Sequence, residues 1–388
     1  MAPEAATFIE SMYDGDEVTI NFGKATKTIT MKSGIRQGDP LSPALFSALV
    51  GHILRPLIIK WKAKGWGVEL DPAQPGERIT LLAYADDVTV FAASRSQASA
   101  MINEMTTALE GINLRLLPET CSSLCSKTPD GSETAKINLG TEVIPIHGAL
   151  VVLGQEISFQ KDSMHAFQHR LRQAWKTAHA NAILLRSTAM AHGARIRLLQ
   201  ALVKPSLLYG AETWKLTPAL LAKIIGAERA FSRWCMRLTN RSGRTDDEER
   251  DLAAWVQWQA DTARQIAKTT NKQKIERWHV TAIRLHWQWA GKAARNTGSL
   301  NQKAATVHIR PVGSGRPRAH WAQLLRQFSI KELRGNADSW VQLAENKVQW
   351  LSFCDLFVEF VETQVLRADT RATLARDAVS IRQENIEQ

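Results

Sequence analysis

Two adjacent aspartates, Asp86 and Asp87, separate two apolar runs and have the clearest potential for chemistry in this chain. The runs on either side, residues 79–84 and 88–91, are rich in the β-branched, aliphatic and aromatic residues typical of strands. The pattern predicts a hairpin with both acids at its bend. Solvation and turn geometry alone would favour such an acidic turn. If the hairpin is buried, the same pair could bind a divalent metal ion through hard oxygen ligands.

The order of the two acids suggests different roles for them. Successive side chains of a regular strand point to opposite faces, so only a bend would let both carboxylates approach one site. We therefore expect Asp86 to be the more direct metal ligand and Asp87 the secondary one.

A second polar stretch, residues 33–46, reads SGIRQGDPLSPALF. Its glycines, Gly34 and Gly38, would permit a close backbone approach, and Arg36 and Gln37 offer hydrogen-bond donors. Ser42, followed by proline, is typical of a capped helix start. An ordinary loop before a core helix would show the same pattern. The stretch is therefore either a substrate-binding loop or such a connecting loop.

The charge of the chain is unevenly distributed. There are 49 Lys and Arg against 38 Asp and Glu, which gives a net charge of +11 and favours a polyanionic partner over a small metabolite. Residues 1–160 carry a net −5, residues 161–240 a net +10 and residues 241–388 a net +6. The middle segment is therefore the candidate for phosphate contact, although a solvated basic face of a helical bundle has the same composition. The candidate contacts are Arg170, Arg172, Lys176, Arg195 and Arg197.

Four scattered cysteines argue against a disulfide scaffold and favour a reducing intracellular compartment, either nucleus or cytoplasm. The close pair Cys121 and Cys125 lacks a second pair at zinc-finger spacing. His165 and His169 are spaced for one helix face, which we expect to be solvated. The most apolar window, 41–59, is interrupted by charged residues and prolines, so we expect a buried amphipathic helix and no membrane partner.

The chain divides by composition into three predicted regions. Residues 1–160 combine strand-like and helix-like segments, including a hairpin near Gly23 and a helix over 97–109. Residues 161–240 read as basic helices. After a polar run at 240–251, residues 241–388 read as helical and hold eight of the 13 tryptophans, which we expect to be mostly core. The fold class is therefore α+β.

The two polar stretches together resemble a known family. QGDPLSP followed about forty residues later by AYADD is similar to consecutive blocks of the reverse transcriptase palm, especially in non-LTR (LINE-type) retrotransposons. The resemblance implies a partial polymerase palm, an antiparallel sheet with helices, over 1–160. It also implies a helical thumb over 161–240, followed by a mainly helical C-terminal region over 241–388. The implied activity is RNA-directed DNA synthesis, a nucleotidyl transfer with Mg²⁺ (or Mn²⁺), an RNA template, a DNA primer and deoxynucleotides.

The resemblance also implies roles for particular residues. Asp86 and Asp87 would be the catalytic metal ligands, because two ions about 3.5–4 Å apart need carboxylate oxygens. Tyr84 would lie near the primer end, and Gln37 and Gly38, with Arg36 beside them, would line the substrate site. Residues 150–159 look like the short strand that grips the primer, although a simple edge strand would show the same pattern.

Other tracts resemble parts of LINE-like proteins without naming an activity. Tyr209, Glu212 and Trp214 belong to a Tyr-Gly-x-Glu-x-Trp pattern and are interpreted as packing residues. The tract 312–321 contains Gly-Arg-Pro-Arg and ends at Trp321; a flexible basic linker or a minor-groove hook would both fit it.

Two departures from the family pattern bear on activity. The family has a further metal-binding aspartate upstream of the Gln-Gly block, and none of the acids before Ser33 has the apolar strand context expected for it. Thr120 stands where the family has a lysine. We therefore expect an N-terminally truncated chain, with two open hypotheses: a reverse transcriptase domain, or an inactive nucleic-acid-binding remnant of one.

Overall fold

The computed structural model divides the chain into two compact units, which are described separately. The first comprises 1–123 and 129–146, and the second 124–128 and 147–388. The predicted second and third regions thus fall within one unit. The residues that the structure describes are 3–15, 17–23, 25–30, 34–70, 76–126, 136–159, 163–238, 248–306 and 321–366. The Gly-Arg-Pro-Arg tract and most of the polar run at 240–251 lie outside them.

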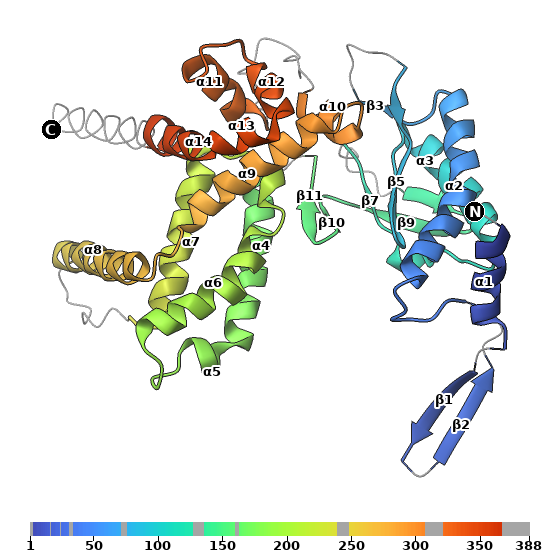
Figure 1. Ribbon diagram of the computed structural model, residues 1–388, viewed down its shortest axis with the longest axis horizontal. Helices are drawn as coiled ribbons and strands as arrows, with labels where there is room; N and C mark the ends of the chain where they lie inside the picture. The colour runs from blue at the N-terminus through green and yellow to red at the C-terminus, as the bar shows by residue number, and fades with distance from the viewer. Residues whose placement is uncertain are drawn as a thin grey trace. The chain divides into compact units, whose positions relative to one another are not determined.

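The first unit mixes helices with small antiparallel sheets (Figure 1). Its helices are α1 (Pro3–Tyr13), α2 (Ser42–Ala63), α3 (Arg95–Glu110) and the 3-10 turn η1 (Pro118–Thr120). Its two-stranded pairs are β1 (Glu17–Phe22) with β2 (Ala25–Thr30), β3 (Val68–Glu69) with β4 (Arg78–Ile79), and β5 (Leu81–Tyr84) with β6 (Asp87–Val90). A three-stranded sheet has the order β7-β9-β8, formed by β7 (Ser123–Leu124), β8 (Lys136–Leu139) and β9 (Glu142–His147). The predicted α and β mixture, the hairpin near Gly23 and the helix around 97–109 are confirmed.

The core of this unit is small and lies between α2, α3 and the β5–β6 hairpin. It contains Val50, Leu54, Trp61, Met101, Met105 and Leu109, with Leu81, Val88 and Val90 packed against it. Glu104 of α3 fastens the two helices, since it accepts hydrogen bonds from Trp61 Nε1 (2.8 Å) and Lys64 Nζ (3.1 Å) and pairs with Lys60 (3.0 Å). The two helices therefore form the base on which the hairpin rests.

Helix α2 covers the apolar window of the sequence but buries only part of it. Ser42, Val50, Leu54 and Trp61 are buried, and much of the helix surface, including Ile59, is exposed. By length and composition alone, α2 could cross a membrane. The predicted serine cap is wrong: Leu41 occupies the cap position, and Ser42 Oγ instead donates to the carbonyl of Arg36 (2.6 Å).

The second unit begins with a short hairpin and is otherwise helical (Figure 1). The hairpin pairs β10 (Leu150–Val152) with β11 (Gln155–Ile157). The first helices are α4 (Ser163–Ala180), α5 (Ala182–Leu185), α6 (His192–Leu208), the 3-10 turn η2 (Ala211–Thr213) and α7 (Pro218–Met236). They are followed by α8 (Glu248–Lys272), α9 (Trp278–Arg295), α10 (Leu300–Thr306), α11 (Gln323–Lys331), α12 (Ser339–Glu345), α13 (Lys347–Ser352), α14 (Cys354–Phe360) and the π-helical turn η3 (Val361–Leu366).

Tryptophans dominate the core of the second unit. Trp287 and Trp350 stack with ring centroids 3.6 Å apart, and each indole N–H donates to the backbone carbonyl of the other residue, at 3.0 and 3.1 Å. A Cβ at Gly291 would collide with the Trp350 indole. Trp278 and Trp340 are also fully buried, so the predicted core role of the tryptophans is confirmed for most of them, whereas Trp255 is exposed.

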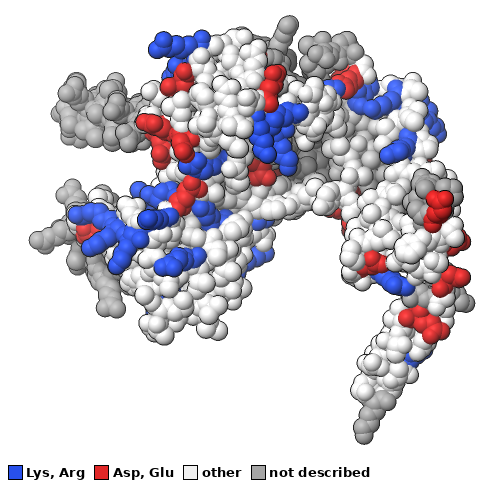
Figure 2. Space-filling model, in the orientation of Figure 1, with Lys and Arg blue, Asp and Glu red and all other residues white. Residues whose placement is uncertain are grey.

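Charge is distributed differently over the two units. On the face shown in Figure 2, blue Lys and Arg gather over α8, where Arg264, Lys268 and Lys272 are exposed, and both units also show red Asp and Glu. The basic character therefore extends beyond the predicted segment 161–240.

Candidate active site

The Asp86 and Asp87 carboxylates lie at the tip of the β5–β6 hairpin. Tyr84 pairs with Asp87, so the two-residue turn consists of Ala85 and Asp86, and Asp87 is the first residue of β6. Ala85 has φ +52°, a left-handed conformation that costs a non-glycine residue about 1–2 kcal/mol. Strain of this kind often accompanies functional turns. The predicted hairpin is present, with the first acid in its bend.

The two faces of the hairpin have different environments. Leu81, Val88 and Val90 pack towards α2 and α3. By strand alternation, Tyr84 and Asp87 share the opposite face with Leu82. That face is open: Tyr84 is 69 % exposed, and Asp86 and Asp87 are exposed as well. The predicted burial therefore applies to the base of the hairpin and not to its tip, where the carboxylates are accessible.

The base of the hairpin is fixed by polar contacts that the sequence analysis did not identify. Thr80 is 1 % exposed, and its carbonyl accepts from the Phe91 N–H (2.8 Å). Gln97 Oε1 accepts from the backbone N–H groups of Gly67 (3.2 Å) and Ala93 (2.7 Å). The position of Gln97 at the start of α3, shortly after β6, could have indicated this contact from the sequence.

The Gln-Gly loop lies between β2 and the start of α2 and contacts the end of α1. Arg36 Nη2 donates to the Met12 carbonyl (2.7 Å), and its guanidinium lies 5.4 Å from the Tyr13 ring centroid. Asp39 Oδ1 accepts from the Leu41 N–H (2.8 Å), which stabilises the turn. The Tyr13 hydroxyl donates to Asp39 Oδ2 (3.4 Å). Arg36 thus holds the loop against α1, a role that the sequence did not reveal.

Gln37 and Gly38 are exposed, as is most of this loop. Gly38 has φ +93° and Gly34 has φ +98°, so both positions favour glycine for conformational reasons. A Cβ at either position would meet nothing within 4 Å. Within the described residues, the glycines therefore relieve no crowding, and the space beside them remains open to a ligand.

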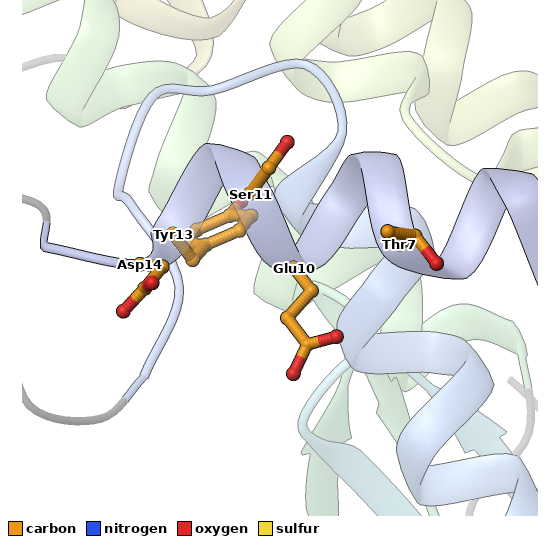
Figure 3. Close-up of a pocket in the computed structure, with 5 residues that line it drawn as sticks. All are labelled: Thr7, Glu10, Ser11, Tyr13 and Asp14. Carbon is orange, nitrogen blue, oxygen red and sulfur yellow. The ribbon is translucent and has the colours of Figure 1, made fainter.

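A surface depression near this loop is shown in Figure 3. Its lining residues, Thr7, Glu10, Ser11, Tyr13 and Asp14, all come from α1 or the residue that follows it. One helix face with no converging polar groups from other elements is a weak ligand site. The depression does not include Asp86 or Asp87.

The ligand set at the hairpin tip consists of two carboxylates. Within the part of the chain that the structure describes, no group of three or more His, Cys, Asp or Glu side chains could hold a metal ion. Thr120, at the position where the resemblance implies a lysine, is exposed in η1, and its hydroxyl donates to the Leu117 carbonyl (2.8 Å). It therefore brings no positive charge to this region.

Two of the five predicted phosphate contacts have structural roles instead. Arg195 is 4 % exposed, and its Nη1 donates to the Cys235 carbonyl (2.8 Å). Arg170 donates from Nε and Nη2 to the Ser206 carbonyl, and its guanidinium lies 4.9 Å from the Tyr209 ring centroid. Burial lowers the pKa of Arg170, partly offset by the Tyr209 hydroxyl. Sequence spacing alone could not separate these inward-facing arginines from surface ones.

The other three predicted contacts lie at the surface. Arg172 and Lys176 are exposed one helical turn apart on α4, and Arg197 is exposed on α6. Arg172 makes only a long ion pair with Glu156 (3.4 Å). Arg197 Nε donates to Gln273 Oε1 (2.6 Å). Arg172 and Lys176 are consequently the best placed of the set to meet a phosphate.

His165 and His169 do not form a solvated face as expected. Their ring nitrogens pair with the two carboxylate oxygens of Glu156 on β11, at 2.6 and 3.3 Å. Burial lowers the pKa of His169, and the charge of Glu156 opposes that shift. This cluster attaches the β10–β11 hairpin to α4.

Comparison with known proteins agrees with the motif geometry. Residues 2–171 match the family model for reverse transcriptase (RNA-dependent DNA polymerase). The match covers the Gln-Gly loop, the acidic hairpin and the β10–β11 hairpin, and it ends within α4.

Three relatives extend this finding. A putative uncharacterized transposon-derived protein of Caenorhabditis elegans is 23% identical over 287 residues, which cover 71% of this chain and 95% of that protein. The Pol polyprotein of the type-1 retrotransposable element R2 of Nasonia vitripennis is 32% identical over 130 residues, or 32% of this chain and 11% of the polyprotein. A Pol polyprotein from a type-2 retrotransposable element of Drosophila melanogaster is 28% identical over 116 residues, or 29% of this chain and 10% of the polyprotein.

The similarity thus spans about a tenth of each of these two Pol polyproteins and nearly all of the nematode protein. The family model and the retrotransposon relatives agree with the motifs on the Gln-Gly loop and the acidic hairpin. Residues 2–171 of this chain therefore match the reverse transcriptase family, and the chain is similar over this region to Pol polyproteins of R2 retrotransposable elements.

Proposed function

We propose that the Asp86–Asp87 hairpin is the metal-binding part of an RNA-directed DNA polymerase centre that works by two-metal nucleotidyl transfer. The observation that carries the proposal is the exposed pair of adjacent carboxylates on a tight hairpin, within a segment that matches the reverse transcriptase family. The proposed substrates are deoxynucleotides, an RNA template and a DNA primer.

The residues at the tip fit a Mg²⁺ or Mn²⁺ ion. Mg²⁺ is commonly bound by one or two carboxylates, with water and substrate phosphate oxygens as the other ligands. Asp86 and Asp87 supply two carboxylates that are open to such ligands. When bound, the ions would activate the primer 3′-hydroxyl and stabilise the leaving pyrophosphate.

The surrounding residues would position the substrates. Tyr84, on the same face as Asp87, presents an exposed ring against which the primer end could rest. Gln37 and Gly38 leave open space and hydrogen-bonding groups for the nucleotide or template. Asp39 and Tyr13 keep this loop in its turn through their hydrogen bonds.

The exposed basic side chains of α4 would contact the phosphate backbone of the nucleic acid. Arg172 and Lys176 lie on one helix face, where each can neutralise a phosphate. Replacing both with alanine should weaken binding of an RNA–DNA hybrid and reduce the slope of log K against log salt by about two, one for each lost phosphate contact. Replacing the exposed Lys62 of α2 is the matched control and should leave the slope unchanged.

A second function, nucleic-acid binding without catalysis, is favoured by one observation. Within the described residues, the tip offers two carboxylates and no third acid to complete a shared site. Under this function, the chain would bind hybrids through α4 but would transfer no nucleotide.

DNA synthesis on an RNA template distinguishes the two functions. The polymerase proposal predicts Mg²⁺-dependent extension of an annealed DNA primer that is lost in Asp86→Asn and retained in Glu142→Gln, a control at an exposed acid on β9. Salt-sensitive hybrid binding with no extension would establish the second function. Extension that persists in Asp86→Asn would contradict the proposed role of the hairpin.

A further inference from the structure

The β10–β11 hairpin is attached to α4 through Glu156, and it also contacts a loop, residues 209–214. The Tyr209 hydroxyl donates to the Leu153 carbonyl in the hairpin turn (2.9 Å). Gln155 Nε2 donates back to the Tyr209 carbonyl, and Trp214 Nε1 donates to Gln155 Oε1 (3.4 Å). Hydrogen bonds thus run in both directions between the hairpin and the 209–214 loop.

Two glycines allow this close contact. Gly154 and Gly210 both have positive φ, at +77° and +73°. A Cβ at Gly210 would collide with the Gln155 side chain, and one at Gly154 would lie 3.2 Å from the Tyr209 ring. The hairpin and the 209–214 loop therefore cannot move independently without breaking this packing.

The opposite side of the 209–214 loop is held by the C-terminal helices. Trp321 Nε1 donates to the Glu212 carbonyl (2.9 Å). The Trp321 ring lies with its centroid 4.4 Å from that of His286 on α9 and 4.8 Å from that of Trp289. Burial lowers the pKa of His286 to about 3, with backbone groups of Trp214 and Glu212 opposing the shift, so the imidazole is neutral at physiological pH.

We infer that Trp321 is a positioning residue for the β10–β11 hairpin and acts on it through the 209–214 loop. Two tracts of the sequence, the Tyr-Gly-x-Glu-x-Trp pattern and the tryptophan that ends the Gly-Arg-Pro-Arg tract, meet in this contact. Through this contact, the C-terminal helices stabilise the β10–β11 hairpin, which we expect to hold the primer strand. Only that last assignment rests on the proposed function.

Amide hydrogen exchange, measured on the whole chain, tests whether Trp321 stabilises the β10–β11 hairpin through the 209–214 loop. We call this connection the Trp321 link. Trp321→Phe keeps an aromatic ring against His286 but removes the N–H donor. We expect exchange of the amides in 150–157 and 209–214 to rise about fivefold, the effect of losing one neutral hydrogen bond. Trp350→Phe is the matched control, because it removes an indole N–H from the same core without touching the 209–214 loop.

Tyr209→Phe tests the second step of the link. It should raise exchange in 150–157 while leaving that of α9 unchanged, since it acts beyond the Trp321 contact. The inference is overturned if Trp321→Phe leaves 150–157 unchanged. It is also overturned if Trp321→Phe and Trp350→Phe raise exchange equally across the whole second unit, because Trp321 would then be an ordinary core residue.

A binding ratio separates positioning from general stability. An RNA–DNA hybrid with a recessed DNA 3′ end and a blunt hybrid of equal length are the two probes. Trp321→Phe should raise the Kd for the recessed hybrid several-fold more than that for the blunt one, whereas Trp350→Phe should leave the ratio unchanged. If Trp321→Phe changes the Kd for both hybrids equally and also raises amide exchange in 150–157, Trp321 stabilises the hairpin. The hairpin then does not hold the primer end.

Discussion

Around Asp86 and Asp87, the first unit leaves its reactive side chains exposed above a small core, whereas the second unit buries most of its tryptophans in an extended one. Among the residues that the structure describes, the hairpin tip is exposed, and its base relies on α2, α3 and a few polar contacts. In the second unit, buried aliphatic and aromatic side chains connect helices from α4 to α14. The first unit therefore keeps its candidate site residues accessible, whereas the second unit has the larger buried core.

The largest expected effect is in the tryptophan core. Trp350→Ala should destabilise the second unit by about 3–5 kcal/mol, because it creates a large cavity and leaves the Trp287 ring without its stacking partner. Chemical denaturation followed by tryptophan fluorescence measures this loss. A change below about 1 kcal/mol would show that the core is not as tightly packed as the structure indicates.

A buried ion pair should give the next effect. Glu228 is 1 % exposed and pairs with Arg277 Nε at 2.9 Å. Arg277→Met should cost about 3 kcal/mol, because it removes the ion-pair partner of a buried carboxylate. The control is Arg264→Met, which breaks the exposed pair with Asp261 and should cost less than about 0.5 kcal/mol in the same denaturation experiment. Equal losses would contradict the contrast between surface and core.

A smaller, pH-dependent effect is expected in the first unit. Burial would raise the pKa of Glu104, but hydrogen bonds from Trp61, Lys60 and Lys64 outweigh it, and the net pKa is lowered from 4.5. The resulting stability is present above pH 4.5 and is lost as the pH falls through the lower folded-state pKa. Glu104→Gln should cost about 1 kcal/mol at pH 7 and progressively less as the pH falls below 4.5, as measured by unfolding over a pH series. A mutational effect that is independent of pH would rule out this origin.

The smallest expected effect is at the hairpin tip. Asp86→Asn and Asp87→Asn should each change the free energy of unfolding by less than about 0.5 kcal/mol, because both side chains are exposed and outside the core. Thermal unfolding of each variant measures this change. A large stabilisation would instead indicate that the two carboxylates repel each other strongly.

The sequence predicted the parts of the structure that depend on local pattern. The acidic hairpin, the loop before α2 and the tryptophan core follow from strand residues, glycines and helical spacing, and the QGDPLSP and YADD motifs led to the right family. The sequence could not predict whether a given arginine side chain faces solvent or the core, because Arg172 and Arg195 both lie in the same basic helical segment. Only packing shows that one is exposed and the other donates to the Cys235 carbonyl.

Polar contacts between residues far apart in the sequence could not be predicted either. The Glu156 contacts to His165 and His169, and the Trp321 bond to Glu212, join residues whose pairing no local pattern specifies. Ala85 at positive φ was also unexpected, since alanine gives no sign of left-handed geometry.

Divalent-metal binding distinguishes the Asp86–Asp87 hairpin from other exposed acids of the chain. Mn²⁺ can be titrated into the whole chain and the free ion followed by electron paramagnetic resonance, with Glu142→Gln as the control for an exposed acid. We predict that the native chain and this control bind Mn²⁺ equally, and that the Asp86→Asn, Asp87→Asn double variant loses that binding while remaining folded. Unchanged Mn²⁺ binding by the double variant would contradict the assignment of the acidic hairpin as the metal site.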